Sequence, residues 1–258
     1  MGIGGNLMWT PLAYNIFKRT GKIVVFVKNK LIYNDKLNLW KNLDYILDNS
    51  ELNLTYEYVR DSELYFIIDM NIRPDLTNDN KMNIICHTIN ARCSCFGYYN
   101  IEPNIYMKFS KNEIQHMKNI INKLPKKFIV IEPHSKTSWC AHKQYPLNKW
   151  QTIINNLYKK IPIVQMSLPT NKVLKNVIDI GKNIKNFREA ALLLKYATLF
   201  IGSEGGLMHA AKVHNTKSLI IYSPMFDPIW TKYDNNINVW IKTREHQNCF
   251  NTGTCTKC

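Results

Sequence analysis

The stretch Thr198–Ala211, TLFIGSEGGLMHAA, most narrows the folds that this chain can adopt. An apolar run ends in a short polar and glycine cluster, and a second apolar segment follows at once. A short apolar run bounded by glycine is typical of a buried strand, so the stretch predicts a strand, a tight turn and the start of a helix. Gly205 and Gly206 allow positive φ angles in the turn and let a ligand approach the backbone closely.

The helix start after this turn is a candidate anion site. The first N–H groups of a helix have no partner within the helix, and its dipole is positive at that end, so phosphate is a suitable ligand. His209 lies within the first turn of the predicted helix. The same pattern also fits an ordinary strand–turn–helix corner with a core histidine, and these residues alone leave both interpretations open.

The second half of the chain alternates apolar runs with amphipathic segments. We expect strands at 128–133, 161–166 and 218–224, and helices at 147–160 and 187–197. Strands that alternate with helices predict a parallel sheet with crossover helices. Ligands of such sheets bind outside the carboxyl ends of the strands. Three of the strands are followed by the loops EPHSK, SLPTN and GSEGG, which we therefore expect to converge on one pocket.

The first half predicts a less regular series. Residues 7–21 have the spacing of an amphipathic helix that follows a glycine-rich turn, with Pro11 in its first turns and Gly21 at its end. We also expect strands at 22–27, 63–69 and 82–89, a short helix within 40–49 and a helix at 111–124.

These two series predict an α/β fold class with two Rossmann-like doubly wound parallel-sheet domains that face each other across a cleft. We expect the N-terminal domain at residues 1–124 and the C-terminal domain, with a cysteine-rich tail, at residues 125–258. The N-terminal domain is expected to lack its first strand, because the sequence opens directly on the glycine-rich turn.

Composition narrows the function classes. The 258 residues are 45% hydrophobic and 21% charged, as in a globular protein, and carry a net charge of +15. A basic surface attracts nucleotides, nucleic acid or anionic lipid headgroups, although dispersed lysines also fit a solvated surface set by genome composition. The densest basic run is KLPKK at 123–127, and no basic–aromatic platform accompanies it. We therefore expect no nucleic-acid partner.

The expected location follows from two features that the sequence lacks. No apolar run approaches the roughly 20 residues that span a bilayer. The opening MGIGGNLMWT lacks the basic and then apolar order of a signal peptide. We expect a cytoplasmic protein whose positive charge permits peripheral contact with the anionic inner face of a membrane.

The seven cysteines do not form a secreted disulfide pattern. Four of them are scattered or closely spaced along the chain: Cys86, Cys93, Cys95 and Cys140. The tail reads H-x2-C-x5-C-x2-C, at His246, Cys249, Cys255 and Cys258. This spacing fits a tetrahedral zinc site, a redox pair at the final CxxC, or uncommitted thiols. Because only one CxxC pair is present, we predict no metal site.

Several motifs, in order, resemble glycosyltransferase family 9, which contains the bacterial lipopolysaccharide heptosyltransferases. IEPHSKTS resembles the family's strand and its loop of proline, glycine and a small residue. KQYPLNKWQTIINNL resembles its lysine-aromatic-aromatic-proline motif and the helix that follows, and GSEGGLMHAA resembles its histidine-containing helix start. GIGGNLMWTPLA resembles, more thinly, a glycine-aspartate turn. The resemblance covers most of residues 128–224 and little of the first half.

The resemblance implies a two-domain GT-B fold, a nucleotide-diphosphate sugar as substrate, and no metal or other cofactor. Lys143 matches the lysine that contacts the donor phosphate, although it also fits a surface lysine. Glu204 and His209 match the helix-start motif, where they would position the sugar or brace the turn. The donor-binding residues that the resemblance implies are Ser135, Lys143, Ser203, Glu204, Gly205, Gly206 and His209.

The sequence departs from the family at the catalytic base. The first loop of the family carries an aspartate that is proposed to deprotonate the acceptor hydroxyl. Here Gly5 or Asn6 takes its place, and neither acts as a general base. The catalytic candidates are therefore Asn6 by position and Glu204 by chemistry, with Asp69 as a further carboxylate.

We predict a metal-independent glycosyltransferase that moves a heptose-like or other sugar to a glycan or lipid-linked acceptor. Two alternatives stay open: a non-catalytic nucleotide-sugar or glycan-binding relative that has lost the base, and a nucleotide-sugar epimerase of the same fold. Aromatic residues near the end of the chain fit either a cover for the nucleotide base or ordinary packing: Phe226, Trp230 and Tyr233.

Overall fold

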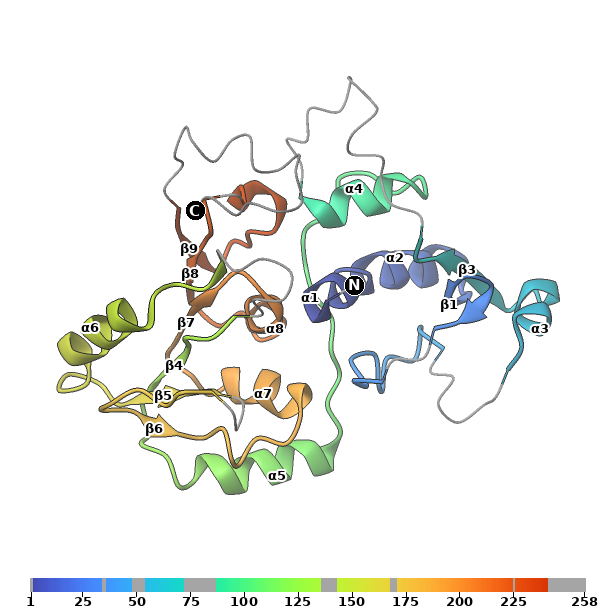
Figure 1. Ribbon diagram of the computed structural model, residues 1–258. Coiled ribbons are helices and arrows are strands. Elements are labelled where there is room, and N and C mark those ends of the chain that lie inside the picture. The colour runs from blue at the N-terminus through green and yellow to red at the C-terminus, as the bar shows by residue number, and fades with distance from the viewer. Residues whose placement is uncertain are drawn as a thin grey trace. The chain divides into compact units, whose positions relative to one another are not determined.

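The computed structural model describes residues 2–33, 36–47, 54–71, 87–135, 143–167, 171–224 and 226–240. The chain divides into two compact units, Met1–Ser110 and Lys111–Cys258, each built of helices and strands (Figure 1). The boundary lies before the helix α5 (Lys111–Ile121), whereas we expected it after this helix, at 124/125. Helix α5 belongs with the second unit because Arg188 of that unit binds Glu113 in the first turn of α5.

The sheet of the first unit has the strand order β2-β1-β3. The central strand β1 (Ile23–Lys28) is parallel to β3 (Tyr65–Asp69) and antiparallel to the short β2 (Leu31–Ile32). Residues 24–27 of β1 are fully or almost fully buried, as expected for a strand covered on both faces. The helices of this unit are α1 (Ile3–Leu7), α2 (Thr10–Thr20), α3 (Tyr56–Asp61) and α4 (Thr88–Ser94).

Helix α2 confirms the sequence signals at both of its ends. Pro11 lies in its first turn, and Gly21 follows it with a φ of 71°, the left-handed conformation that ends a helix. Its apolar face buries Leu12 and Ile16 completely. The ring of Trp9, just before α2, packs against Phe26 of β1 with centroids 6.0 Å apart. This contact attaches the helix to the sheet.

Three predictions for the first unit were wrong in part. The glycine-rich turn forms α1, because Asn6 N and Met8 N donate helical hydrogen bonds to Gly2 O and Gly4 O. Within 40–49, the described residues form turns instead of a helix, and Ile46 pairs with β1 in a parallel bridge. Of the strand expected at 82–89, residues 82–86 lie outside the described part. Thr88 and Ile89 begin α4, which the His87 ring caps by accepting from Ile89 N.

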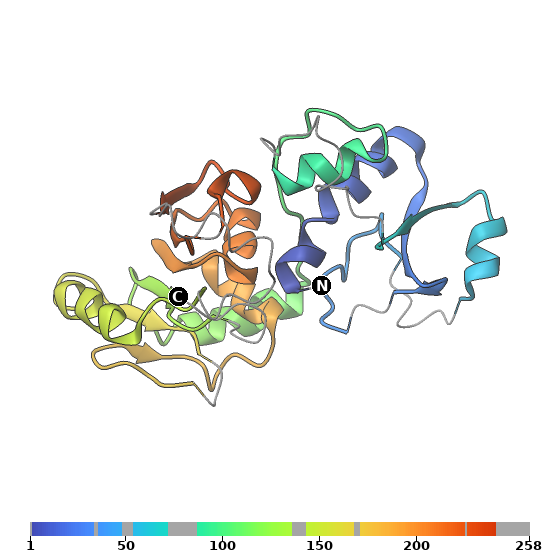
Figure 2. The ribbon, with the colours of Figure 1, turned by 45° about the horizontal axis from the view of Figure 1, so that its top comes forward.

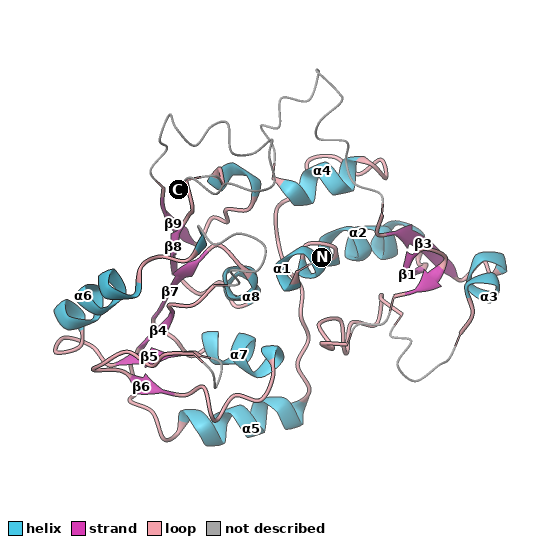
Figure 3. Cartoon of the chain, viewed as in Figure 1, coloured by secondary structure: helices cyan, strands magenta, loops and turns pink. Residues whose placement is uncertain are grey.

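In the second unit, the described strands form a six-stranded parallel sheet in the order β6-β5-β4-β7-β8-β9 (Figure 3). Its strands are β4 (Ile129–Glu132), β5 (Ile163–Gln165), β6 (Ile178–Asp179), β7 (Leu199–Ser203), β8 (Ser218–Ile221) and β9 (Asn236–Val239). Its other helices are α6 (Leu147–Leu157), α7 (Phe187–Leu194), α8 (Gly206–Val213) and the 3-10 turn η2 (Pro228–Trp230). The alternation of strands and helices in this half is confirmed, and the short edge strands β6 and β9 were not predicted.

Helices cover both faces of this sheet, with α6 on one side and α7 and α8 on the other (Figures 1 and 2). Trp150 and Ile154 of α6 pack on Ile129 and Ile131 of β4 in one apolar core. Phe200 of β7 is also fully buried, and its position in the strand places it on the opposite face. The central strands β4 and β7 are therefore enclosed on both faces.

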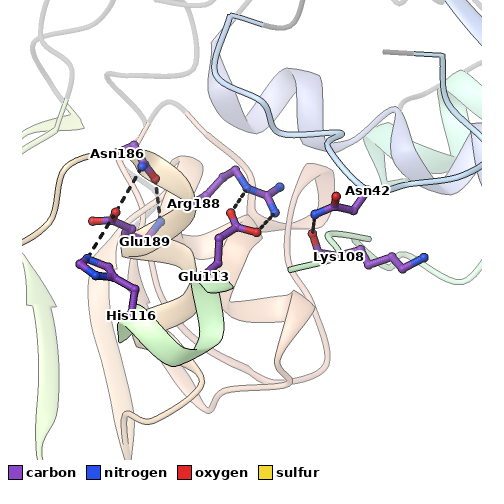
Figure 4. Close-up of polar contacts among 7 residues, drawn as sticks. All are labelled: Asn42, Lys108, Glu113, His116, Asn186, Arg188 and Glu189. Atoms are coloured by element: carbon purple, nitrogen blue, oxygen red, sulfur yellow. Dashed lines mark hydrogen bonds and ion pairs between the residues drawn. The ribbon is translucent and has the colours of Figure 1, made fainter. Parts of the chain in front are cut away.

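A charged pair fixes α5 to this unit (Figure 4). The Arg188 guanidinium of α7 donates from Nε to Glu113 Oε1 at 2.6 Å and from Nη2 to Glu113 Oε2 at 3.0 Å. The Arg188 side chain is only 5% exposed, so the two hydrogen bonds compensate a charge that has been removed from water. Asn186 caps the start of α7 by accepting from Glu189 N at 2.9 Å.

Candidate functional site

The order of the strands locates the site. From β4 the chain passes through α6 to β5 at one side of the sheet, and from β7 it passes through α8 to β8 at the other side. The winding therefore reverses between β4 and β7, which are parallel neighbours, with Glu132 in register with Gly202. Ligands of doubly wound sheets bind outside the carboxyl ends of the strands at such a reversal.

Gln144 shapes the loop that follows β4. Its side-chain amide donates to Pro133 O at 2.5 Å and to Tyr145 O at 3.0 Å, and its Oε1 accepts from Ser135 N at 2.9 Å. One side chain thus ties together the start and the end of a loop whose residues 136–142 lie outside the described part. We did not single out Gln144 from the sequence. Its place beside Lys143 in the KQYP motif was the available signal.

Lys143 connects the loops that follow β4, β7 and β8. Its ammonium donates to Glu204 Oε2 and lies 4.4 Å from the centroid of the Phe226 ring. The Lys143 and Glu204 side chains are 15% and 10% exposed. Lys143 is therefore not an ordinary surface lysine. Phe226 also contacts Trp230 edge to face, so it packs within this part of the protein.

The turn between β7 and α8 is formed without a left-handed glycine. Gly205 has φ 171° and ψ −166°, an extended backbone, and Gly206 is the first residue of α8. Among the described glycines, positive φ angles occur at Gly21 and Gly97. The positive φ angles that Gly205 and Gly206 allow are therefore not used, because an extended residue leads directly into the helix. Ser203, the last residue of β7, is buried.

His209 lies inside the protein, with its ring 1% exposed. Its Nδ1 is 2.6 Å from the hydroxyl of Tyr233, and its Nε2 is 3.9 Å from Glu204 Oε1. The side chains of Lys143, Glu204, His209 and Tyr233 thus form a continuous polar chain. His209 is held from the interior by its contact with Tyr233, which agrees with the interpretation of a core histidine.

The loops after β4 and β5 are also connected. His134 Nε2 and the side-chain amide of Gln165 both contact Lys172 O, at 2.8 and 3.0 Å. Residues 168–170 of the SLPTN loop lie outside the described part. The Ser135 hydroxyl oxygen is buried and has no hydrogen-bond partner in the described structure. The contacts with Lys172 O link the loop after β4 to the segment after β5, and the Lys143–Glu204 pair links it to the loop after β7. The single pocket expected among the three loops stays a prediction.

The candidates for catalysis in the first unit are held by structural hydrogen bonds. Asn6 is 4% exposed, and its amide donates to the Tyr33 hydroxyl at 2.9 Å. An amide has no group that takes up a proton near neutral pH. Asp69 ends β3, and its Oδ1 accepts from Asn71 N at 2.8 Å. Asp69 therefore stabilises its own turn.

The remaining candidates fall partly outside the described structure. His246, Cys249, Cys255 and Cys258 belong to the tail beyond residue 240, which is not described. In the described ranges, no group of three or more metal-ligating side chains is close enough to hold an ion. Cys93 and Cys95 are free thiols, and burial raises the pKa of Cys93 to about 12. Nor does any helix of the described ranges have the length and apolarity needed to cross a membrane.

The comparisons with known proteins agree with this architecture. The model of the family "Glycosyltransferase family 9 (heptosyltransferase)" matches residues 74–258. No curated protein matches the chain in sequence. The chain resembles the crystal structure of the glycosyl transferase family 9 from Veillonella parvula DSM 2008, with 14% identity and a TM-score of 0.69. The aligned part covers 93% of this chain and 84% of that one.

Two further solved structures share the fold. The iron-containing dodecameric glycosyltransferase TibC from enterotoxigenic E. coli H10407 has a TM-score of 0.63 and 14% identity, over 92% of this chain and 60% of that one. The E. coli heptosyltransferase WaaC with ADP-2-deoxy-2-fluoro heptose has a TM-score of 0.56 and 12% identity, over 93% and 90% of the two chains. At these identities the likeness establishes an α/β architecture with parallel sheets, that of the GT-B heptosyltransferases.

Proposed function

Because the chain belongs to glycosyltransferase family 9, we propose that it transfers a sugar from a nucleotide-diphosphate donor of the ADP-heptose type to a glycan or lipid-linked acceptor. One observation carries this proposal: Lys143 joins three strand-end loops beside the point where the sheet reverses its winding. Such a point is where nucleotides bind in doubly wound sheets.

The chemistry of the site suits a diphosphate leaving group. In the transfer, the bond between the anomeric carbon and the phosphate oxygen breaks while the acceptor oxygen bonds to the carbon and loses its proton to a base. The departing nucleoside diphosphate gains negative charge. The ammonium of Lys143 and the N–H groups at the start of α8 would stabilise that charge without a metal ion. Glu204 would release Lys143 when the diphosphate binds.

A second candidate function is a donor-binding relative without transferase activity. Gly5 and Asn6 favour it, because one of them matches the position of the family's aspartate and neither takes up a proton; the Asn6 amide is committed to Tyr33. The donor site would then bind nucleotide sugar, while no group at this position takes the proton of the acceptor hydroxyl. The Asn6→Asp variant separates the two functions. It gains activity if only the base is missing, and it leaves the turnover unchanged if another carboxylate already serves.

The test of donor binding is thermal unfolding in the presence of ADP, UDP, GDP and their sugars. A ligand at about 100 times its Kd adds about 2.7 kcal/mol to the free energy of unfolding. We expect ADP compounds to raise the Tm of the wild type and of Lys159→Ala, an exposed lysine of the same unit. We expect no rise for Lys143→Ala.

Two outcomes of the unfolding measurement would contradict the proposal. If no nucleotide raises the Tm of the folded wild type, the proposal of a nucleotide-sugar substrate fails. If ADP raises the Tm equally in Lys143→Ala, the donor binds elsewhere. Once a donor is found, release of nucleoside diphosphate with and without a glycan acceptor distinguishes the transferase from the binding protein.

A further inference from the structure

Gln144 holds together the two ends of the loop that follows β4. Its amide nitrogen donates to Pro133 O at 2.5 Å and to Tyr145 O at 3.0 Å, and its Oε1 accepts from Ser135 N at 2.9 Å. In KQYP, Gln144 takes the place of the first aromatic residue of the lysine-aromatic-aromatic-proline motif. An aromatic side chain cannot make all three hydrogen bonds. These contacts therefore set this chain apart from that motif.

The backbone of the loop depends on these three bonds. All of them are partly buried, and Pro133 itself lies in the interior. A buried backbone N–H or C=O group needs a partner, and here one side chain supplies it to two carbonyl groups and one N–H group. Without the amide, these groups would have to turn toward other partners. The conformation of residues 133–135 is therefore set by Gln144.

The hydroxyl of Ser135 is the group that this conformation places. Its Oγ is buried and has no hydrogen-bond partner in the part of the chain that the structure describes. The N–H group of the same residue is held by Gln144, which fixes the backbone from which the hydroxyl projects. A buried hydroxyl without a partner is unfavourable, so a ligand oxygen that accepts from it gains free energy.

Lys143, the residue before Gln144, carries the positive charge of the site. Its ammonium pairs with Glu204 and lies 4.4 Å from the centroid of the Phe226 ring. Gln144 and Ser135 are nine positions apart in the chain, and the hydrogen bond between them brings the two ends of the loop together. The position of the Ser135 hydroxyl relative to the Lys143 backbone therefore depends on the Gln144 amide.

We propose that Gln144 is a positioning residue of the donor site, which places the Ser135 hydroxyl relative to Lys143 before the nucleoside diphosphate binds. The inference rests on the proposed function, since it concerns the same site. Gln144 acts through Ser135 and does not touch the ligand, because both N–H groups of its amide are donated to the backbone. Its contribution is preorganisation, since the ligand does not have to order the loop on binding.

The experiment is titration calorimetry of the full chain with ADP at pH 7, with the wild type, Gln144→Ala and Gln151→Ala. Gln151 of α6 gives a matched control, because its amide also bonds to a backbone N–H and a backbone carbonyl, those of Lys175, at 2.9 and 3.1 Å. We expect Gln144→Ala to lose about tenfold in affinity, as residues that orient a ligand-binding group do. Gln151→Ala should bind ADP like the wild type.

The variant Ser135→Ala separates positioning from a merely structural role. If Gln144 acts by placing the Ser135 hydroxyl, the loss caused by Gln144→Ala should shrink from about tenfold to about threefold or less when Ser135 is already alanine. A loss that is equally large in both backgrounds overturns the inference, because Gln144 then acts independently of Ser135. An ADP affinity of Gln144→Ala that equals that of the wild type overturns it as well.

A second measurement keeps the inference testable if Gln144→Ala does not fold. In the wild type without ligand, the amide hydrogen of Ser135 should exchange with solvent at least about tenfold more slowly than in an unstructured peptide, because Gln144 accepts it. Exchange at the rate of an unstructured peptide would show that the loop is not held before the ligand binds, and the inference would be wrong.

Failure of the inference differs from failure of the proposed function. If ADP binds the wild type and Gln144→Ala with the same affinity, the donor site stands and the role of Gln144 is overturned. If no nucleoside diphosphate binds the wild type, the proposed function fails and the role of Gln144 fails with it.

Discussion

Lys143 and Glu204 lie 61 positions apart in the chain, and the folded protein joins them in an ion pair at the carboxyl end of one sheet. Each side chain has little contact with water, at 15% and 10% exposure. The carboxylate of Glu204 therefore holds the cation that we propose for the donor diphosphate. In the protein without a ligand, the Glu204 carboxylate thus neutralises the charge of Lys143.

This competition predicts the effect of Glu204→Gln. The amide keeps the size of the side chain but removes the charge that holds Lys143, so ADP should bind about three- to tenfold more tightly, or about 0.6–1.4 kcal/mol. Calorimetry at pH 7 measures the change, with Glu102→Gln, which alters an exposed glutamate of the first unit, as the control. A loss of ADP affinity in Glu204→Gln would show that the carboxylate contacts the nucleotide instead of competing with it.

The surroundings of Gly202 and Gly205 predict that an alanine substitution lowers the free energy of unfolding by different amounts at the two positions. An alanine Cβ at Gly202 would lie 2.5 Å from the fully buried Phe200 ring, so we expect Gly202→Ala to lower the free energy of unfolding by about 1–3 kcal/mol. At Gly205 an alanine Cβ would lie 3.8 Å from Ser203 O, an ordinary contact distance, and the backbone is extended. Gly205→Ala should cost only about 0.5 kcal/mol, as an alanine at the start of a helix.

Urea unfolding of the two glycine variants measures these losses. Gly205→Ala should nevertheless weaken ADP binding, because its methyl group occupies space at the helix start that we propose for the diphosphate. Equal losses of stability in the two variants would contradict the steric argument. Unchanged ADP affinity in Gly205→Ala would contradict the placement of the ligand.

The pair Arg188–Glu113 predicts a large loss of stability when one partner is removed. Glu113→Gln leaves the buried guanidinium without its counter-charge, so the free energy of unfolding should fall by about 3 kcal/mol. The matched control is Asp44→Asn, which breaks the exposed pair with Lys108 and should change stability little. Chemical denaturation compares the two variants. A similar small effect in both would show that the buried pair contributes no more than a surface pair.

Glu132 predicts how stability depends on pH. Its pKa is raised from 4.5 to about 8 in the folded protein, so the folded state binds a proton that the unfolded state has released between these values. The free energy of unfolding should therefore fall as the pH rises from about 5 to about 8, by an amount on the order of a few kcal/mol.

Glu132→Gln removes this linkage, so its advantage over the wild type should grow with pH. Urea unfolding at pH 5.5 and pH 8 measures the difference between the two proteins. Glu102→Gln, whose side chain is exposed, should follow the wild type. A difference between wild type and Glu132→Gln that does not change with pH would show that Glu132 titrates in the same range in both states.

Periodicity and order in the sequence determined most of the second unit. The apolar runs that became β4, β5, β7 and β8 and the amphipathic segments that became α6 and α7 are local patterns, and local burial produces them. The strand–turn–helix at 198–211 and the end of α2 at Gly21 were also predicted from the sequence. The placement of candidate residues at strand ends follows from the same order.

Only the tertiary structure decided how those residues meet. The apolar residues Ile237 and Val239 of the edge strand β9 are 66% and 42% exposed, so burial did not impose a run of apolar residues on this segment. Its hydrogen bonding to β8 makes it a strand. Gly205 is extended because it connects the end of β7 to the first residue of α8. The contact of Lys143 with Glu204 and the desolvation of Glu132 depend on neighbours distant in sequence. Local patterns report periodicity and burial, whereas these contacts arise only when parallel strands bring their carboxyl ends together.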